Sequence, residues 1–352
     1  MNFKIAIKNL FKDYWGSISL VYILIITLIS IFAYWISPDS SQNANQMNLN
    51  IHSKPPGFST FILKIPQNLN IDNFPISKNE IFIDDYKILN NKLFYSEVGS
   101  FSIEQKEIDI TEILKDNDIK EFELKFIKKK TFYLGTDKYG RDMLSRMIIG
   151  SRVSISIGFI AVIISLIIGI LIGLTSGYFG GWFDDFIVWL INVFWAIPTL
   201  LLVIAITISL GKGYWQVFFA VGLTMWVEVA RLVRGKVRTL KEKLFIQSAK
   251  VLGFSSCRIM LNHILPNLIG PLIVISAANF ASAILIESGL SFLGIGVQPP
   301  VPSWGGMVKD HFRYIILGKE YLAILPGLAI MSLVLSFMIL GNSLRDAFDV
   351  RN

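Results

Sequence analysis

The stretch VSISIGFIAVIISLIIGILIGL, residues 153–174, decides the fold, because no charged side chain interrupts it. An α-helix rises about 1.5 Å per residue, so a segment of this length crosses a hydrocarbon core of about 30 Å. Five further predominantly apolar segments have a comparable length, at residues 18–36, 186–210, 214–230, 268–286 and 321–340. Together they predict a polytopic membrane protein and disfavour the alternative of helices buried in a soluble core.

The composition agrees with a membrane protein. Of the 352 residues, 53% are hydrophobic and 17% are charged, whereas soluble domains average roughly 25% charged residues. The net charge is +7, yet residues 38–133 hold 12 Lys and Arg against 14 Asp and Glu. The positive excess therefore lies near the predicted spans, where it is a signal of membrane topology, and we expect no nucleic-acid partner.

The distribution of basic residues predicts the orientation in the bilayer. With the N-terminus inside, the cytoplasmic segments hold 13 Lys and Arg and the short outer loops hold 4. Short cytoplasmic loops retain positive charge, so both termini are expected in the cytoplasm. The segment 18–36 is longer than the apolar core of a signal peptide and no cleavage site follows it, so we expect it to remain as an anchor.

One large segment lies outside the predicted spans, at residues 38–133, and this orientation makes it extracytoplasmic. Within it, the stretch EFELKF at 121–126 places Phe122, Leu124 and Phe126 on one face with period two, which predicts a half-buried strand. We therefore predict an all-α polytopic protein with six transmembrane helices and a small strand-rich extracytoplasmic insert between the first two. Three domains follow, residues 1–37, 38–133 and 134–352, with a cytoplasmic loop at 231–267.

The sequence offers little for catalysis or metal binding. Cys257 is the single cysteine and is expected to be a packing residue, and His52, His263 and His311 are too scattered for metal-ligand spacing. The GKG at 211–213 lacks the rest of a phosphate-binding loop. We expect no enzymatic activity, metal or cofactor in this chain.

The loop contains FIQSAKVLGFSSCRIMLNHILPN, residues 245–267, which predicts two short amphipathic helices. Gly253 suits the left-handed residue that ends the first helix, Ser255 can cap the second, and Pro266 is expected to stop it. The predicted apolar stripes are Phe245, Ala249 and Leu252 in the first helix, and Cys257, Met260, Leu261 and Ile264 in the second. The pattern alone fits a connector on the membrane surface, a helix-turn-helix or a docking element; tethering at both ends disfavours DNA binding.

The same stretch resembles the EAA loop of ABC importer permeases. The matching residues are Ala249, Gly253, Leu265, Pro266 and Asn267, whereas Gln247 and Ser248 stand where the family usually has Glu and Ala. The resemblance implies that this loop docks on an ATPase subunit and transmits its closure. A neutral amide gives a hydrogen bond of about 0.5–1.5 kcal/mol, against about 1.5–3 kcal/mol for a charged group, so Gln247 can support docking but not an ion pair.

Four further stretches narrow this resemblance to the dipeptide and oligopeptide permeases, and within them to the "C" partner of the permease pair. They are LGTDKYGRDMLSR at 134–146, GYFGGWFDD at 177–185, SGLSFLGIGVQPPVPSWG at 288–305 and LGNSLRDAFDVR at 340–351. The resemblance implies a second related permease, two ATPase subunits that bind the ATP, and an extracytoplasmic substrate-binding protein. It also implies a place in the plasma (inner) membrane of a bacterium. Substrate identity stays open between peptides, nickel and other cargo.

Two other classes of membrane protein are alternatives to an importer subunit. A self-sufficient secondary transporter or channel is disfavoured, because the spans lack the several ionisable residues that ion coupling requires. A membrane sensor that signals through its outer domain is the third class.

Several single residues carry expectations of their own. Asp137 is expected to cap a helix from which Arg141 and Arg146 point away, and Trp304 to anchor a proline-rich turn at the membrane interface. The helix is expected to be a scaffold, with contact to a binding protein as the alternative. Trp304 is in addition a candidate for the translocation path or for an interface with the binding protein.

Predictions also follow for two carboxylates, one within a predicted span and one at the end of another. Glu287 is a candidate for the translocation path or for an interface, and Glu228 is expected to pair with Arg231, three residues further along a helix. Pro198 and Pro326 are candidates for helix kinks.

Overall fold

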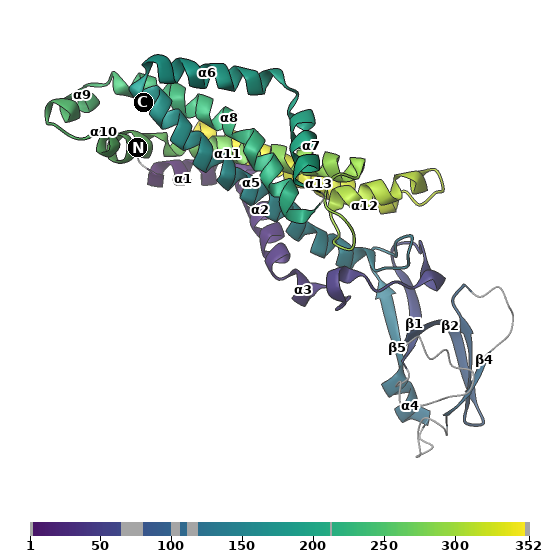
Figure 1. Cartoon of the computed structure of the whole chain (residues 1–352). Helices are drawn as coiled ribbons and strands as arrows, with labels where there is room; N and C mark the ends of the chain where they lie inside the picture. Colours follow the sequence, from purple (N-terminus) through teal and green to yellow (C-terminus); the bar gives the residue numbers. More distant parts are fainter. Residues whose placement is uncertain (1–2, 65–79, 100–105, 111–118, 212, 349–352) are drawn as a thin grey trace. The chain divides into compact units, whose positions relative to one another are not determined.

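The structure is a computed structural model of the whole chain, and it describes residues 3–64, 80–99, 106–110, 119–211 and 213–348 (Figure 1). The end of the motif at 340–351 lies outside these residues. The chain divides into two compact units. The membrane unit comprises Met1–Ile36, Met147–Arg313 and Ala323–Asn352, and the sheet unit comprises Ser37–Arg146 and Tyr314–Leu322.

Helices make up the membrane unit. In chain order the helices are α1 (Phe3–Lys12), α2 (Tyr14–Ile31), α3 (Ala33–Ile36), α5 (Met143–Phe179), α6 (Gly181–Ala196), α7 (Thr199–Leu210), α8 (Tyr214–Lys241), α9 (Leu244–Val251), α10 (Ser256–Arg258), η4 (Ile259–Ile264), α11 (Leu265–Leu293), α12 (Trp304–His311), η5 (Phe312–Ile315) and α13 (Tyr321–Phe348). Among the described residues, α2, α5, α8, α13 and the continuous helix from Ser256 to Leu293 are each long and apolar enough to cross a membrane.

At the place of the remaining predicted span lies a bent pair of apolar helices, α6 and α7, which meet at 92°. Ile197, at the break, has the extended backbone angles φ −92° and ψ 127°, as expected for a residue before a proline. Pro198 follows and precedes the first residue of α7. Five of the six predicted spans are thus single helices, and this bent pair stands at the sixth; the kink at Pro198 is confirmed, whereas Pro326 lies inside α13.

The helices α5 and α8 approach one another along a seam of glycines and valines. An added Cβ at Gly173 would lie 2.7 Å from the carbonyl oxygen of Ala230 and 2.8 Å from Cβ of Val233. The glycine–valine seam repeats this contact every four residues, with Gly169, Gly173 and Gly177 of α5 against Val229, Val233 and Val237 of α8. Glycines at this spacing allow two backbones to pack closely in a membrane.

The sheet unit contains one antiparallel sheet, which confirms the predicted strand-rich insert. Its strands are β1 (Phe58–Lys64), β2 (Glu80–Leu89), β3 (Lys92–Glu97), β4 (Lys106–Asp109) and β5 (Ile127–Phe132), in the order β4-β3-β2-β1-β5. Alternate residues of a strand face opposite sides of the sheet, and both sides are covered here. Leu63 belongs to the apolar cluster on one side, whereas Ile62 belongs to the cluster on the other.

The segment EFELKF lies in a helix, α4 (Ile119–Phe126), so the strand prediction there was wrong. Phe122 and Phe126 are both buried in the cluster on one face of the sheet, whereas the side chain of Leu124 is 81% exposed. Residues four apart share one face of a helix, and residues two apart do not. The two phenylalanines therefore satisfy the helical period, and Leu124 is left in solvent.

We predict that Gly173→Leu destabilises the membrane unit. The larger side chain cannot fit against the backbone of α8, and overpacking typically costs about 1–3 kcal/mol. Thermal unfolding of the purified protein in detergent should show a lower midpoint. Gly235→Ala is the matched control, because no atom lies within 4 Å of a Cβ added there. Equal midpoints for the two variants would contradict the role of the seam.

Candidate functional site

The connection between α8 and α11 folds as a helical hairpin of α9, α10 and the π-helix η4. Gly253 has φ +78°, and the Ser255 hydroxyl accepts a hydrogen bond from the backbone N–H of Arg258 at 3.4 Å. Both agree with the predicted helix end and cap. This hairpin, residues 244–264, is called the α9–η4 hairpin below.

A buried face attaches the α9–η4 hairpin to the membrane helices. Ile246 and Ala249 of α9 are buried in one apolar cluster with Ile259 and Ile264 of η4. Leu174 and Tyr178 of α5 and Val229, Val233 and Val237 of α8 belong to the same cluster. The cluster therefore continues the glycine–valine seam into the hairpin.

The predicted apolar stripes of the hairpin were right for Ala249, Met260 and Ile264, which pack in this cluster, and wrong for the other four residues. In α9 Ile246 is buried together with Ala249, whereas Phe245 and Leu252 are exposed. In the second helix Cys257 and Leu261 are also exposed, so Cys257 is not a packing residue. Apolar residues occupy more than one face of these short helices, and the partner helices determine which face is covered.

The opposite face of the α9–η4 hairpin exposes large apolar side chains. The exposed fractions are 80% for Leu244, 88% for Val251 and 72% for Leu252. Gln247 and Ser248 are exposed beside them, and the Gln247 amide donates a hydrogen bond of 3.1 Å to the carbonyl of Glu242. Exposed apolar groups of this kind, rimmed by polar ones, are typical of protein contact surfaces.

Pro266 does not stop the helix, contrary to the prediction. It lies in the first turn of α11, directly after η4, and the helix runs without a break from Ser256 to Leu293. In an α-helix a proline ring clashes with the carbonyl four residues earlier. The wider π turn before Pro266 accommodates the ring, and the Asn267 amide donates to the carbonyl of His263 at 2.7 Å.

An ion pair joins α6 to α8 near the hairpin. Arg234 donates from Nε and Nη2 to the two carboxylate oxygens of Asp184, at 2.5 and 2.7 Å. Arg238 lies 3.8 Å from the same carboxylate. Asp184 is buried, and this two-point geometry fixes the angle between the side chains as well as their distance. The pair therefore holds the first turn of α6 against α8.

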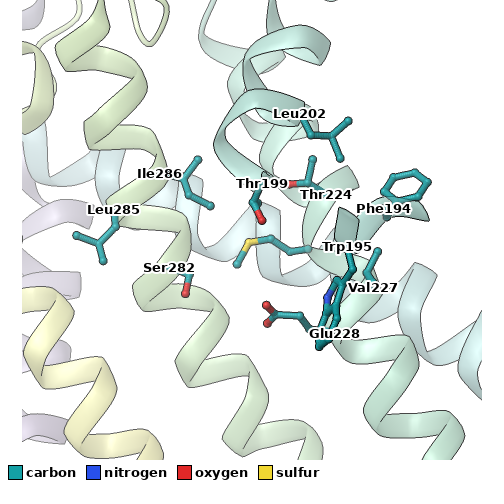
Figure 2. Close-up of a pocket in the computed structure, with 11 residues that line it drawn as sticks. Phe194, Trp195, Thr199, Leu202, Thr224, Val227, Glu228, Ser282, Leu285 and Ile286 are labelled. Atoms are coloured by element: carbon teal, nitrogen blue, oxygen red, sulfur yellow. The ribbon is translucent and has the colours of Figure 1, made fainter. Parts of the chain in front are cut away.

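A cavity of about 320 Å³ lies between α6, α7, α8 and α11. Figure 2 shows Glu228 of α8 directed into it, with Thr199 of α7 and Ser282 of α11 on its walls. The predicted pairing of Glu228 with Arg231 is wrong. The Arg231 guanidinium lies over the Trp195 ring instead, 3.9 Å from the centroid.

Glu287, the other intramembrane carboxylate, is completely buried and lies outside this cavity. Its Oε1 accepts a hydrogen bond from the Ser291 hydroxyl at 2.7 Å. The Ser303 hydroxyl donates to Ser291 at 3.3 Å and accepts from the N–H of Gly306 at 3.1 Å, so Ser303 caps α12. Glu287 is therefore part of a polar chain that links α11 to the start of α12.

Trp304 is 3% exposed, so it is not an interfacial anchor. Its indole N–H donates to the carbonyl of Met147 at 2.9 Å, and its ring lies against Gly150 of α5. The proline-rich turn before Trp304 places its ring against Gly150, where a larger residue would clash with it. Trp304 therefore packs α12 on α5.

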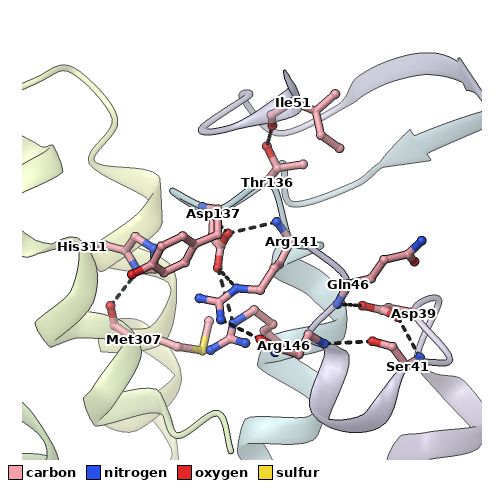
Figure 3. A network of polar contacts seen from close by, with 12 residues as sticks. Asp39, Ser41, Gln46, Ile51, Thr136, Asp137, Arg141, Arg146, Met307 and His311 are labelled. Atoms are coloured by element: carbon pink, nitrogen blue, oxygen red, sulfur yellow. Dashed lines mark hydrogen bonds and ion pairs between the residues drawn. The ribbon is translucent and has the colours of Figure 1, made fainter. Parts of the chain in front are cut away.

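The motif at 134–146 forms a buried polar network in the sheet unit (Figure 3). Asp137 accepts from Nε of Arg141 at 2.6 Å, and Nε of Arg146 lies 3.6 Å from the same oxygen. Asp137 therefore binds both arginines. The prediction that it caps the helix, with the arginines pointing away, was wrong. Asp142 has that position instead, since its carboxylate accepts the backbone N–H of Ser145 at 3.0 Å.

Comparisons with known proteins add to this geometry. Residues 169–351 match the family model described as the binding-protein-dependent transport system inner membrane component. Residues 2–56 match the N-terminal TM domain of oligopeptide transport permease C. This chain belongs to the binding-protein-dependent permease family. It is a permease component of an ABC transporter and, with its several apolar helices, a multi-pass protein of the inner membrane.

Two named relatives of similar sequence are also permease proteins of transport systems. The glutathione transport system permease protein GsiD of Shigella flexneri is 42% identical over 217 residues, which are 62% of this chain and 71% of the relative. The dipeptide transport system permease protein DppC of Alkalihalophilus pseudofirmus is 41% identical over the same shares. A solved structure of the MetNI methionine ABC transporter, in inward-facing conformations, has a TM-score of 0.47 and 17% identity over 60% of this chain and 98% of its own.

Two features of the permease were missed at the level of sequence. The spacing of Gly169, Gly173 and Gly177 was a readable signal for close helix packing. The pairing of Asp184 with Arg234, which are 50 residues apart in the chain, had no such signal.

Among the described residues no cluster of His, Cys, Asp and Glu could hold a metal ion.

We predict that Asp184→Asn destabilises the permease by about 2 kcal/mol, because Arg234 loses a charge-assisted hydrogen-bond partner. Arg234→Lys should reproduce much of the loss, since an ammonium cannot make the two-point contact. Unfolding of the purified protein in detergent measures both. Asp185→Asn is the matched control, because Asp185 is exposed. A loss at Asp185 equal to that at Asp184 would exclude the ion pair as the cause.

Proposed function

We propose that this permease is the non-catalytic, membrane-spanning subunit of an ATP-driven importer of short peptides. The observation that carries the proposal is the α9–η4 hairpin, which is anchored on α5 and α8 by one face and exposes apolar residues on the other. The names of the relatives support the substrate class, since GsiD belongs to a glutathione transport system and DppC to a dipeptide transport system.

The hairpin is proposed to contact a cytoplasmic ATPase subunit. Gln247, Ser248 and Gly253 are exposed and are proposed to lie at this contact. Ala249 is buried and is proposed to act by holding the hairpin on the membrane helices. Leu265, Pro266 and Asn267 are the first residues of α11 and follow the hairpin directly, so that a movement of the ATPase reaches that helix as well.

Membership of the family implies the remaining partners, and the charge distribution supports the orientation in the membrane. A second, related permease completes the translocation path, two ATPase subunits bind and hydrolyse the ATP, and a substrate-binding protein delivers the peptide. The 13 Lys and Arg of the predicted inner segments, against 4 in the short outer loops, support cytoplasmic termini and a cytoplasmic hairpin. The sheet unit is then on the outer side.

The proposed mechanism is alternating access. Closure of the ATPase pair on ATP displaces the α9–η4 hairpin, and the shared apolar cluster moves α5 and α8 with it as one body. The same body carries α6, because Asp184 binds Arg234 at two points. Movement of the hairpin therefore changes the opening between the helices that surround the cavity.

We predict that Val251→Asp weakens binding of the ATPase subunits by at least about tenfold. The residue is 88% exposed, so a charge there leaves the fold intact but removes an apolar contact of the kind that dominates interfaces. Affinity of the purified permease for its ATPase partner in detergent measures the effect. Ile316→Asp, at a residue 89% exposed in the sheet unit, is the control. Undiminished binding by Val251→Asp would refute the contact.

We also predict that Gly253→Val lowers substrate-stimulated ATP hydrolysis by the assembled complex. A β-branched residue does not adopt φ +78° without strain, so the corner between α9 and α10 must distort. Gly253→Asn should retain most of the stimulation, because asparagine tolerates this conformation. If Gly253→Val changes neither assembly nor stimulation, the coupling assignment is wrong.

A further inference from the structure

Glu228 occupies an unusual position for a carboxylate in a membrane-spanning helix. Its side chain is exposed to the cavity between α6, α7, α8 and α11 (Figure 2), and among the described residues that line this cavity it is the one with a charge. The described residues supply no ion pair or hydrogen bond to it, because Arg231 is stacked on Trp195. An uncompensated carboxylate is too costly against lipid, so it must face water, a ligand or another protein.

A second cavity, which is much more open to the surface, continues from the first. It has a volume of about 490 Å³, and Trp195 and Glu228 line both cavities. Its other lining residues include the cations Arg231 and Lys236 and the hydroxyl of Thr239. The two cavities therefore form a path along α8 on which one carboxylate is followed by two positive charges.

The spacing of these charges suits a short peptide. With a helical rise of about 1.5 Å per residue, Lys236 lies about 12 Å further along α8 than Glu228, and Arg231 about 4.5 Å. An extended peptide spans about 3.5 Å per residue, so the two ends of a dipeptide or tripeptide lie about 7–11 Å apart. A cavity of about 320 Å³ is also in the range of small-molecule sites.

We propose that Glu228 binds the ammonium group of a zwitterionic di- or tripeptide as it passes through the membrane, with the peptide carboxylate directed toward Arg231 and Lys236. The inference rests on the proposed function as a peptide importer and assigns a binding site within it. Trp195 contributes by keeping Arg231 stacked, which leaves the Glu228 carboxylate open to the ligand.

Transport by the complete complex tests the site. The permease, its partner permease, the ATPase subunits and the binding protein are reconstituted in liposomes, and uptake of labelled dialanine is measured beside ATP hydrolysis stimulated by the loaded binding protein. Glu228→Gln should lower uptake about tenfold while retaining the stimulation, because the charge-assisted bond is lost and coupling is not. Glu228→Asp, which keeps the charge, should retain most of the uptake.

Undiminished uptake by Glu228→Gln would overturn the proposal. Loss of uptake and stimulation together would assign Glu228 to assembly or coupling and would overturn it as well. A wild-type complex that shows neither activity would instead contradict the proposed function, and a second measurement then decides the site separately.

That measurement is the accessibility of a cysteine in the assembled complex. Cys257 is the single native cysteine, so Cys257→Ser provides a background for Glu228→Cys. The new thiol should react with a cationic thiosulfonate reagent, and dialanine should slow the reaction. Leu223→Cys on another face of α8 is the matched control and should stay unreactive in lipid. A thiol at 228 that does not react would show that the second permease covers this position, and the proposal would fail.

Discussion

The close contact of α5 with α8 is the constraint on which the rest of the membrane unit depends. Three glycines give α5 a face without side chains, and the valines of α8 fill it down to the backbone. The hydrophobic effect does not drive helices together in lipid, so such contacts rely on van der Waals packing and close backbone approach. Because Leu174 and Tyr178 extend this face, the same two helices also bury Ile246 and Ala249 of the hairpin.

The polar groups around this contact are arranged to keep it in one geometry. The Lys241 ammonium donates to the carbonyl of Tyr178 at 2.5 Å, where α5 reaches its last turn. Arg234, two turns earlier in α8, binds Asp184 and so fixes the start of α6. The helix α6 then turns through 92° into α7 at Pro198. The opening that results between α6, α7, α8 and α11 is the cavity that Glu228 lines.

The sequence was sufficient for features that depend on length or on local backbone conformation. The six spans follow from the thickness of the hydrocarbon core, and Gly253 and Ser255 from the needs of a helix end and a helix start. It was insufficient wherever a distant partner decides. Which residues of α9 are buried depends on α5 and α8, and Trp304 finds its place only because Gly150, far earlier in the chain, leaves room. EFELKF fits both periods, and the sheet it covers selects the helix.

Glu228 and Glu287 illustrate the same limit at the candidate site. Each is a carboxylate near the end of an apolar segment, and composition treats them alike. The structure gives Glu287 a hydroxyl partner and removes it from every exposed surface, so its contribution is to hold α12 through Ser291 and Ser303. Glu228 has the opposite surroundings, because the cation three residues away is held by an aromatic ring. Because Arg231 does not pair with it, the Glu228 carboxylate can bind a positively charged group from outside the chain.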